Sequence, residues 1–229
     1  MALLSTKCCE HCEKKICAEN CPPGALVKYG YTMTLNELMQ EIEKDSVFYR
    51  QSSGGVTASG GEPLLQATFV AELFARCHVK GYHTAIETSS EVAFEQFIKV
   101  IPHTNLFLCD LKPVDTHTFK KYTGGNVSII LENLIRLSEY NAEVILRTLL
   151  IPGFNADKDS IAAICDFDRS LGHKIIHFLP YHRLGMQKYI SLSKDYPFEV
   201  AKVMEISDVE ELLRITTKFG IQAKIGSDI

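Results

Sequence analysis

The sequence lacks the features of several special classes of protein. No apolar run approaches the roughly 20 residues that a membrane-spanning helix needs, and the first residues lack the longer apolar core of a signal peptide. There is no run of Lys or Arg, and 24 basic against 28 acidic residues give a net charge of −4. The charge therefore gives no reason to expect a nucleic acid or an anionic membrane as partner. We expect a cytoplasmic protein whose thiols stay reduced.

What the sequence contains is typical of a globular enzyme. The chain has 229 residues, 46% of them hydrophobic and 23% charged, which is enough to bury a sizeable core and excludes wholesale disorder. The eight cysteines are unevenly distributed. Five of them fall within the first 21 residues, whereas Cys77, Cys109 and Cys165 are scattered singly. The clustered cysteines need an explanation and the single ones do not.

Short apolar runs alternate with longer amphipathic segments along most of the chain. Thr34 and Glu37 form a capping box that opens a first helix, and Ser207 and Glu210 form a second one that opens the last helix. We predict strands over 56–59, 84–87, 106–110, 144–151, 175–179 and 222–225, and helices over 65–80, 91–100, 128–140, 158–171 and 207–219. Strands that alternate with helices predict an α/β fold with a mostly parallel sheet.

Such units build either an open doubly wound sheet or a partial (β/α) barrel. Polar residues follow nearly every predicted strand: Gly60, Gly61 and Glu62; Glu87 and Thr88; Asp110, Leu111 and Lys112; Arg147; and His182. In barrels the ligand groups come from the carboxyl ends of several strands, whereas a doubly wound sheet concentrates them at one switch point. This distribution favours a partial barrel of five to six units over 31–229, preceded by a small cysteine-rich segment over 1–30.

The cysteine cluster predicts a metal centre. Its spacing, Cys9-x2-Cys12-x4-Cys17-x3-Cys21 followed by Pro22, resembles the bacterial ferredoxin run, in which four thiolates hold one iron–sulfur cluster. Cys8 could replace Cys9 as a ligand. A zinc site is the alternative, because zinc also accepts four cysteines and His11 lies nearby. Disulfides are not expected in a chain that is not secreted.

Each polar strand end has a structural as well as a functional interpretation. The Gly60–Gly61 pair is either a tight turn or a place where a ligand ammonium reaches strand-end carbonyls, and no P-loop lysine follows it. Asp110 and Lys112 flank Leu111, so their side chains share a face. They could form an ion pair, contact a polar ligand, or leave Lys112 to act as a Schiff-base nucleophile.

Two further strand residues are candidates. Arg147 interrupts an apolar strand, and a buried guanidinium requires a carboxylate or ligand as partner. His182 follows the next predicted strand, where a histidine can be either a structural hydrogen-bonding group or a catalytic base.

Five ordered segments carry a resemblance to one family. They are residues 54–66 (GGVTASGGEPLLQ), 85–88 (AIET), 108–112 (LCDLK), 147–154 (RTLLIPGF) and 178–189 (FLPYHRLGMQKY). Together they resemble the activating enzymes of glycyl-radical enzymes, within the radical S-adenosylmethionine superfamily. The N-terminal cysteines resemble the ferredoxin-type insertion that many of these activases carry.

The resemblance implies a reaction. A reduced [4Fe–4S] cluster would cleave S-adenosylmethionine to methionine and a 5′-deoxyadenosyl radical, which removes a hydrogen atom from a glycine of the partner glycyl-radical enzyme. Flavodoxin or ferredoxin would supply the electron. The protein would position the sulfonium group and exclude water.

The resemblance also implies roles for residues. The Gly60–Gly61–Glu62 turn would hold the methionyl amino group, and Asp110, Leu111 and Lys112 would contact the ribose and methionyl parts. Arg147 would line the cavity and His182 would help to close it. Glu87, Thr88, the Leu108 carbonyl and Asp110 match a monovalent-cation site of pyruvate formate-lyase activating enzyme, which has Asp where this chain has Glu87.

The sequence departs from the family at one place. The catalytic cluster of the family is held by a C-x3-C-x2-C motif, which these 229 residues do not contain: Cys8 and Cys12 have the first spacing, but Lys15 stands at the third position. We expect a chain that lacks its first strand and cluster loop, binds S-adenosylmethionine weakly and does not cleave it. The alternatives are a catalytically inactive iron–sulfur homologue that binds a glycyl-radical enzyme and, more remotely, an aldolase-like barrel that uses Lys112.

Overall fold

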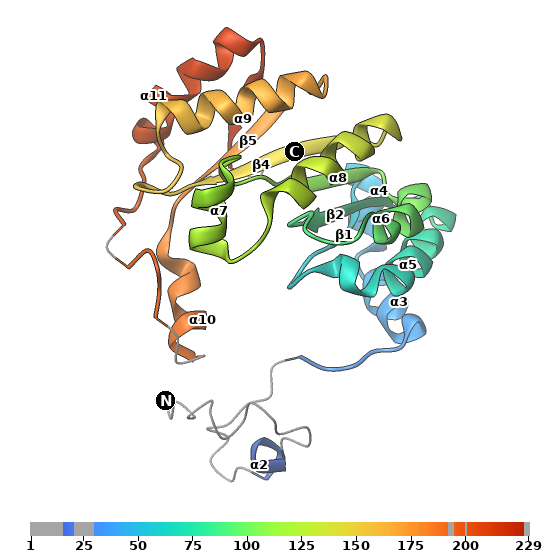
Figure 1. Ribbon diagram of the computed structural model, residues 1–229. Coiled ribbons are helices and arrows are strands. Elements are labelled where there is room, and N and C mark those ends of the chain that lie inside the picture. Colours follow the sequence, from blue (N-terminus) through green and yellow to red (C-terminus); the bar gives the residue numbers. More distant parts are fainter. Residues whose placement is uncertain (1–15, 21–29, 192–194, 200, 227–229) are drawn as a thin grey trace. The chain divides into compact units, whose positions relative to one another are not determined.

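The computed structural model describes residues 16–20, 30–191, 195–199 and 201–226 (Figure 1). The chain groups into two compact units, Met1–Thr34 with His182–Ala201, and Leu35–Tyr181 with Lys202–Ile229. The first unit contains α2 (Ile16–Glu19), η3 (Arg183–Gly185) and α10 (Met186–Ser191). The predicted division at residue 30 stays a prediction.

The larger unit is built on one parallel sheet of six strands, which confirms the predicted α/β class. The strands are β1 (Gly55–Ala58), β2 (His83–Thr88), β3 (Leu106–Asp110), β4 (Val144–Leu150), β5 (Ile175–Pro180) and β6 (Gln222–Ile225). They lie side by side in chain order, each paired in parallel with the next. This order is that of (β/α) barrels and not of doubly wound sheets, where the order reverses.

Two helices, α3 (Leu35–Glu43) and α4 (Ser46–Ser52), precede β1. The helices that join successive strands are η1 (Pro63–Gln66), α5 (Ala67–Val79), α6 (Phe94–Val100), η2 (Ile101–His103), α7 (Thr116–Thr123), α8 (Val127–Glu139), α9 (Lys158–Ser170), α11 (Ile206–Thr216) and η4 (Thr217–Phe219). Figure 1 shows α5, α6 and α8 lying along the strands in sequence order. In the part of the chain that the structure describes, no helix is both long and apolar enough to span a bilayer.

The main core lies between the sheet and these helices. Alternate strand residues such as Ile86, Phe107, Leu146 and Phe178 belong to one buried cluster with the apolar faces of the helices. Because side chains alternate along a strand, the residues between them point to the opposite face of the sheet. On that opposite face Ala85, Leu106 and Leu108 form a small buried apolar cluster with Ile145 packed against it, and polar side chains lie at other positions of the face.

The predicted elements are confirmed with small shifts, except that the cap of the last helix differs and four short α-helices were missed. The structure starts α11 at Ile206, with the Asp208 carboxylate accepting from the Glu205 N–H, so the predicted capping box at Ser207 is wrong. The helices α2, α4, α7 and α10 were not predicted. Of α4 and α7 only Phe119 is buried, so neither contributes the apolar stripe that a sequence pattern detects.

Candidate functional site

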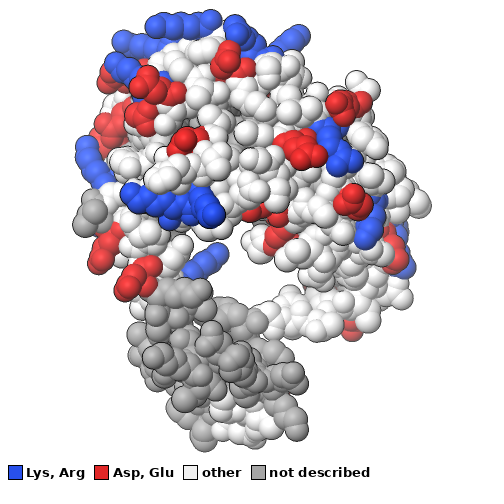
Figure 2. All heavy atoms as spheres, in the orientation of Figure 1, with Lys and Arg blue, Asp and Glu red and all other residues white. Residues whose placement is uncertain are grey.

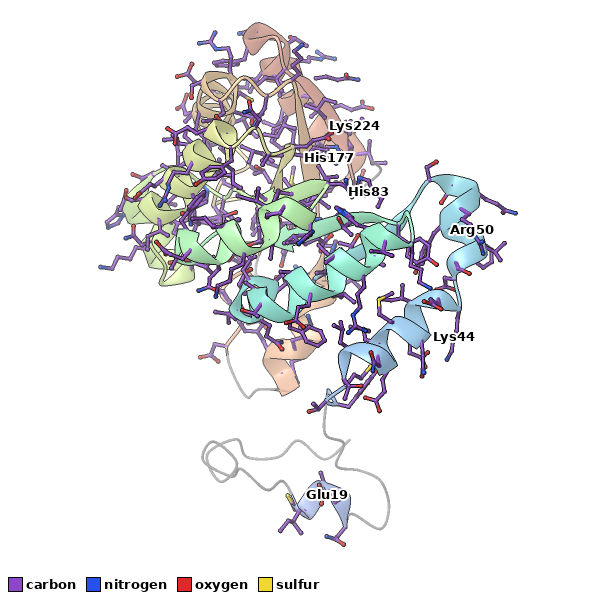
Figure 3. All side chains as sticks on the ribbon, turned by 90° about the vertical axis from the view of Figure 1, so that its right-hand side faces the viewer. Glu19, Lys44, Arg50, His83, His177 and Lys224 are labelled. Atoms are coloured by element: carbon purple, nitrogen blue, oxygen red, sulfur yellow. The ribbon has the colours of Figure 1, made fainter. Side chains whose placement is uncertain are left out.

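A row of polar and charged side chains crosses four neighbouring strands on the sheet face opposite the helices. The register places Asp110 of β3 beside Arg147 of β4, Arg147 beside His177 of β5, and His177 beside Lys224 of β6. Figure 3 shows His177 and Lys224 next to each other. On this face the parallel strands therefore bring together charged residues that lie up to 114 positions apart in the sequence.

Arg147 is the centre of this row. Its Nη1 donates to Glu87 Oε1 at 2.7 Å, and its Nη2 donates to Asp110 Oδ1 at 3.0 Å. Only 10% of the side chain is exposed. Burial lowers the pKa of Arg147, but Asp110 and Glu87 outweigh that effect, so the pKa lies above its ordinary value. The prediction that this guanidinium needs a carboxylate partner is confirmed, and two strands supply one each.

Glu87 is held from two sides. Its Oε2 accepts a hydrogen bond from Ser59 Oγ at 2.7 Å, and its Oε1 accepts from Arg147. Partial burial raises the pKa of Glu87, but the hydrogen bonds from Ser59 and Arg147 outweigh it and the pKa falls below its ordinary value. The carboxylate is therefore charged at neutral pH, and it joins the end of β1 to β2 and β4.

The glycine turn after β1 leaves open space. Among the described residues, an added Cβ at Gly60 or at Gly61 would meet no atom within 4 Å, and Gly60 has φ +122°, a conformation that side-chain-bearing residues rarely adopt. A ligand can thus approach the backbone of this turn closely. The turn fits the predicted role of receiving a ligand ammonium group at strand-end carbonyls.

The side chains of Glu62 and Thr88 are hydrogen-bonded to each other, so their polar atoms are already used within the protein. Thr88 Oγ1 donates to Glu62 Oε1 at 2.9 Å, and the same carboxylate accepts from Ser89 and from the Leu64 N–H. These contacts indicate that both residues shape the turn. The ligand-site roles that the resemblance implies for them stay predictions.

The three residues at the end of β3 lie in different environments. Asp110 is paired with Arg147, so the alternative of an ion pair between Asp110 and Lys112 is not what the structure contains. Leu111 is fully buried in the main core, and its N–H and C=O are bonded to Arg147 and Thr148. Lys112 is half-buried and makes no hydrogen bond or ion pair within the described residues. Its ammonium group is available to an anionic part of a ligand.

The expected monovalent cation stays a prediction. Both oxygens of Glu87 and Oδ1 of Asp110 already accept hydrogen bonds, and the Thr88 hydroxyl donates to Glu62. A cation would have to share these oxygens with Arg147 and Ser59. We therefore derive no step of the chemistry from it.

The remaining predicted residues belong to the smaller unit or lie outside the described residues. Cys9, Cys12 and Cys21 lie outside the described residues, and Cys17 is an exposed free thiol on α2. His182 belongs to the smaller unit, where its Nδ1 accepts from the Leu184 N–H at 3.3 Å. The single cysteines are structural, as expected: burial raises the thiol pKa of Cys109 to about 12.

Two residues of the row, His177 and Lys224, were missed by the sequence analysis. Both lie on predicted strands at positions that alternate with core residues, and that alternation was the signal for finding them. A separate cavity of about 690 Å³ lies near the amino end of β2, and none of the predicted site residues lines it.

Comparison with known proteins gives the family. The family model described as the radical SAM superfamily matches residues 8–164, which is most of the chain. The chain belongs to the radical SAM superfamily. Radical SAM proteins use S-adenosylmethionine (SAM) with a [4Fe–4S] cluster, so the predicted cofactor classes are supported at the level of the family.

The relatives are activating enzymes. The (2S)-3-sulfopropanediol dehydratase activating enzyme of Klebsiella oxytoca is 38% identical over 212 residues, which cover 90% of this chain and 67% of that protein. The 4-hydroxyphenylacetate decarboxylase activating enzyme of Clostridioides difficile strain CD196 is 37% identical over 222 residues, covering 96% of this chain and 70% of that protein. The predicted relationship to glycyl-radical enzyme activases is confirmed.

A solved structure agrees with both results. A domain of the pyruvate-formate lyase-activating enzyme from Bacteroides vulgatus ATCC 8482 superposes with a TM-score of 0.64 at 30% identity. The match covers 76% of this chain and 99% of that chain. The radical SAM fold predicted as a partial barrel is thereby confirmed.

Proposed function

We propose that this chain provides the SAM-binding barrel of a glycyl-radical enzyme activase. The observation that carries the proposal is the strand-end cluster of the open Gly60–Gly61 turn, the Arg147 pairs and the unpaired Lys112. SAM offers an ammonium group, a carboxylate and a sulfonium group. Turn carbonyls suit the first, Lys112 suits the second, and Glu87 and Asp110 provide the negative charge that suits the third.

Bound SAM and a reduced iron–sulfur cluster would supply the radical chemistry, and a glycine of a partner glycyl-radical enzyme would be its target. The residues of the chain orient the ligand and exclude water from it. We propose that Cys9, Cys12, Cys17 and Cys21 hold a ferredoxin-type [4Fe–4S] cluster that passes electrons from a flavodoxin or ferredoxin. We propose a cytoplasmic setting, in which the thiols of these four cysteines would stay reduced and able to bind iron.

Because these 229 residues contain no C-x3-C-x2-C motif, we propose that they bind SAM and do not cleave it on their own. Anaerobic reconstitution with iron and sulfide tests the cluster. One cluster of about four irons, with an EPR spectrum that does not respond to SAM, supports the ferredoxin-type assignment. A spectrum changed by SAM would place the catalytic cluster on these cysteines, and zinc without iron would contradict the assignment.

Calorimetric titration with SAM tests the barrel site. Lys112→Gln should weaken SAM binding about ten-fold, because it removes one charge-assisted contact, without lowering the thermal midpoint. The control is Lys121→Gln, which removes a charge from the exposed surface of α7 and should leave affinity unchanged. Absence of SAM binding by the unmodified chain would overturn the proposal, and borohydride trapping of a carbonyl compound at Lys112 would favour the aldolase alternative.

A further inference from the structure

The Glu62 carboxylate is anchored by four donors. Oε1 accepts from the Leu64 N–H at 3.1 Å and from Thr88 Oγ1 at 2.9 Å, while Oε2 accepts from the N–H and Oγ of Ser89 at 2.9 and 2.8 Å. A carboxylate has about four acceptor positions, so nothing remains for a ligand. Glu62 thus ties the turn that precedes it to the segment 88–92, which begins with the last residue of β2.

That segment holds an unusual backbone conformation. Ser90 has φ 61° although it is not glycine, and its side chain is fully buried. Its N–H donates to Thr88 Oγ1 at 2.9 Å, so the same hydroxyl contacts both Ser90 and Glu62. A left-handed conformation is strained for a non-glycine residue and persists only where its surroundings fix it.

Asn133 fixes this segment from the helix behind it. Asn133 lies on α8, is only 4% exposed, and donates through Nδ2 to the carbonyls of Ser90 and Val92, both at 2.8 Å. A buried amide that satisfies two loop carbonyls is a strong local constraint, because losing it would leave both carbonyls unpaired. The chain of contacts therefore runs from α8 through the segment 88–92 to Glu62.

We propose that Asn133 is a positioning residue for SAM binding, acting through Ser90, Thr88 and the Glu62 carboxylate on the Gly60–Gly61 turn. This inference rests on the proposed function. Two adjacent glycines have no side chains to hold them, so an unanchored turn would have to be ordered when a ligand binds. The Glu62 anchor orders the turn beforehand, and Asn133 keeps the anchor's partners in place.

Hydrogen exchange in the ligand-free protein tests the coupling without SAM. In Asn133→Ala the amides of Ser89 and Leu64, which donate to Glu62, should exchange about ten-fold faster. The control is Leu134→Ala, which empties a fully buried position on the same helix and disturbs the core without removing the loop contacts. If both amides exchange no faster in Asn133→Ala than in Leu134→Ala, the coupling does not exist.

SAM titration tests its consequence. Asn133→Ala should weaken SAM binding about ten-fold relative to Leu134→Ala. Thr88→Val, which removes the bridging hydroxyl, should show the same loss, and Thr88→Ser, which keeps it, should restore affinity. Faster exchange with unchanged affinity would overturn the positioning role. If the unmodified chain does not bind SAM, the proposed function fails instead, and the exchange rates still decide whether Asn133 orders the turn.

Discussion

Arg147 is a buried cation inside a strand, and its ion pairs join three neighbouring strands. Its partners, Glu87 and Asp110, are about one-third exposed, with side-chain exposures of 33% and 38%. Water therefore screens these pairs more than a fully buried bridge, although less than a surface pair. The Arg147 guanidinium itself is shielded from water. Removing it would therefore leave two partly buried carboxylates without a counter-charge, and the loss of stability would measure that effect.

Replacing Arg147 by Leu should lower the free energy of unfolding at pH 7 by about 2 kcal/mol, because two partly buried carboxylates lose their counter-charge. The pKa of Glu87 is depressed in the folded protein, so its contribution is present above the unfolded pKa and is lost as pH falls through the folded pKa. The difference between Arg147→Leu and the parent should therefore shrink as pH falls towards 4. Urea unfolding of the variant and the parent at pH 7 and near pH 4 measures this difference.

The control for that experiment is Lys44→Met, which breaks an exposed ion pair with Glu41 and should change stability by less than about 0.5 kcal/mol at either pH. A penalty for Arg147→Leu that stays the same at low pH would mean that lost packing, and not charge pairing, explains it.

The sequence predicted the contacts of some single residues better than those of others. That Arg147 requires a carboxylate follows from its place in an apolar run. That Glu87 and Asp110 are those carboxylates depends on the strand register, which brings together positions 60 and 37 residues apart. The function of Asn133 was not visible at all, because a polar residue within an amphipathic helix gives no indication of what it bonds.

At the scale of elements, α9 shows how a single side chain starts a helix. Asp157 Oδ1 accepts from the N–H groups of Asp159 and Ser160 at 3.1 and 2.9 Å, and its Oδ2 accepts from Ser160 Oγ. Asp157→Ala should lower the free energy of unfolding by about 1 kcal/mol, because amide donors of the first turn lose their acceptor. The matched change Asp159→Asn leaves the cap intact and should cost less than about 0.5 kcal/mol. Equal losses in a denaturant titration would contradict the capping role.

Elements were predictable where burial imposes a pattern. The strands 106–110 and 222–225 have the predicted bounds, and the main helices agree within a few residues. The helix α7 buries only Phe119, so its polar sequence shows no stripe. Its start was nevertheless marked by Asp115, whose carboxylate accepts from the Thr118 N–H at 2.7 Å. Cap residues thus carry information that apolar periodicity omits.

At the scale of the whole molecule, the sheet has two edges within the described residues. β1 pairs only with β2, and β6 pairs only with β5. The alternation of strands and helices predicted parallel pairing, and the spread of polar residues over several strand ends favoured barrel order over doubly wound order. Figure 2 shows acidic and basic side chains interspersed over the visible face, in keeping with the small net charge.

This arrangement predicts a gradient of stability across the sheet. Four of the five residues of β3 are buried, Asp110 being the exception, and the strand is paired on both sides. No residue of β1 or β6 is buried. Amide exchange should therefore be slowest in β3 and β4 and faster by about two orders of magnitude at the edges, because edge amides open without global unfolding. Exchange of β1 as slow as that of β3 would mean that another strand or chain covers its free edge. In that case the sheet in solution contains a further strand beside β1 and is closer to a closed barrel than the six described strands are. The added strand would then hold the Gly60–Gly61 turn at the end of β1, together with Glu62.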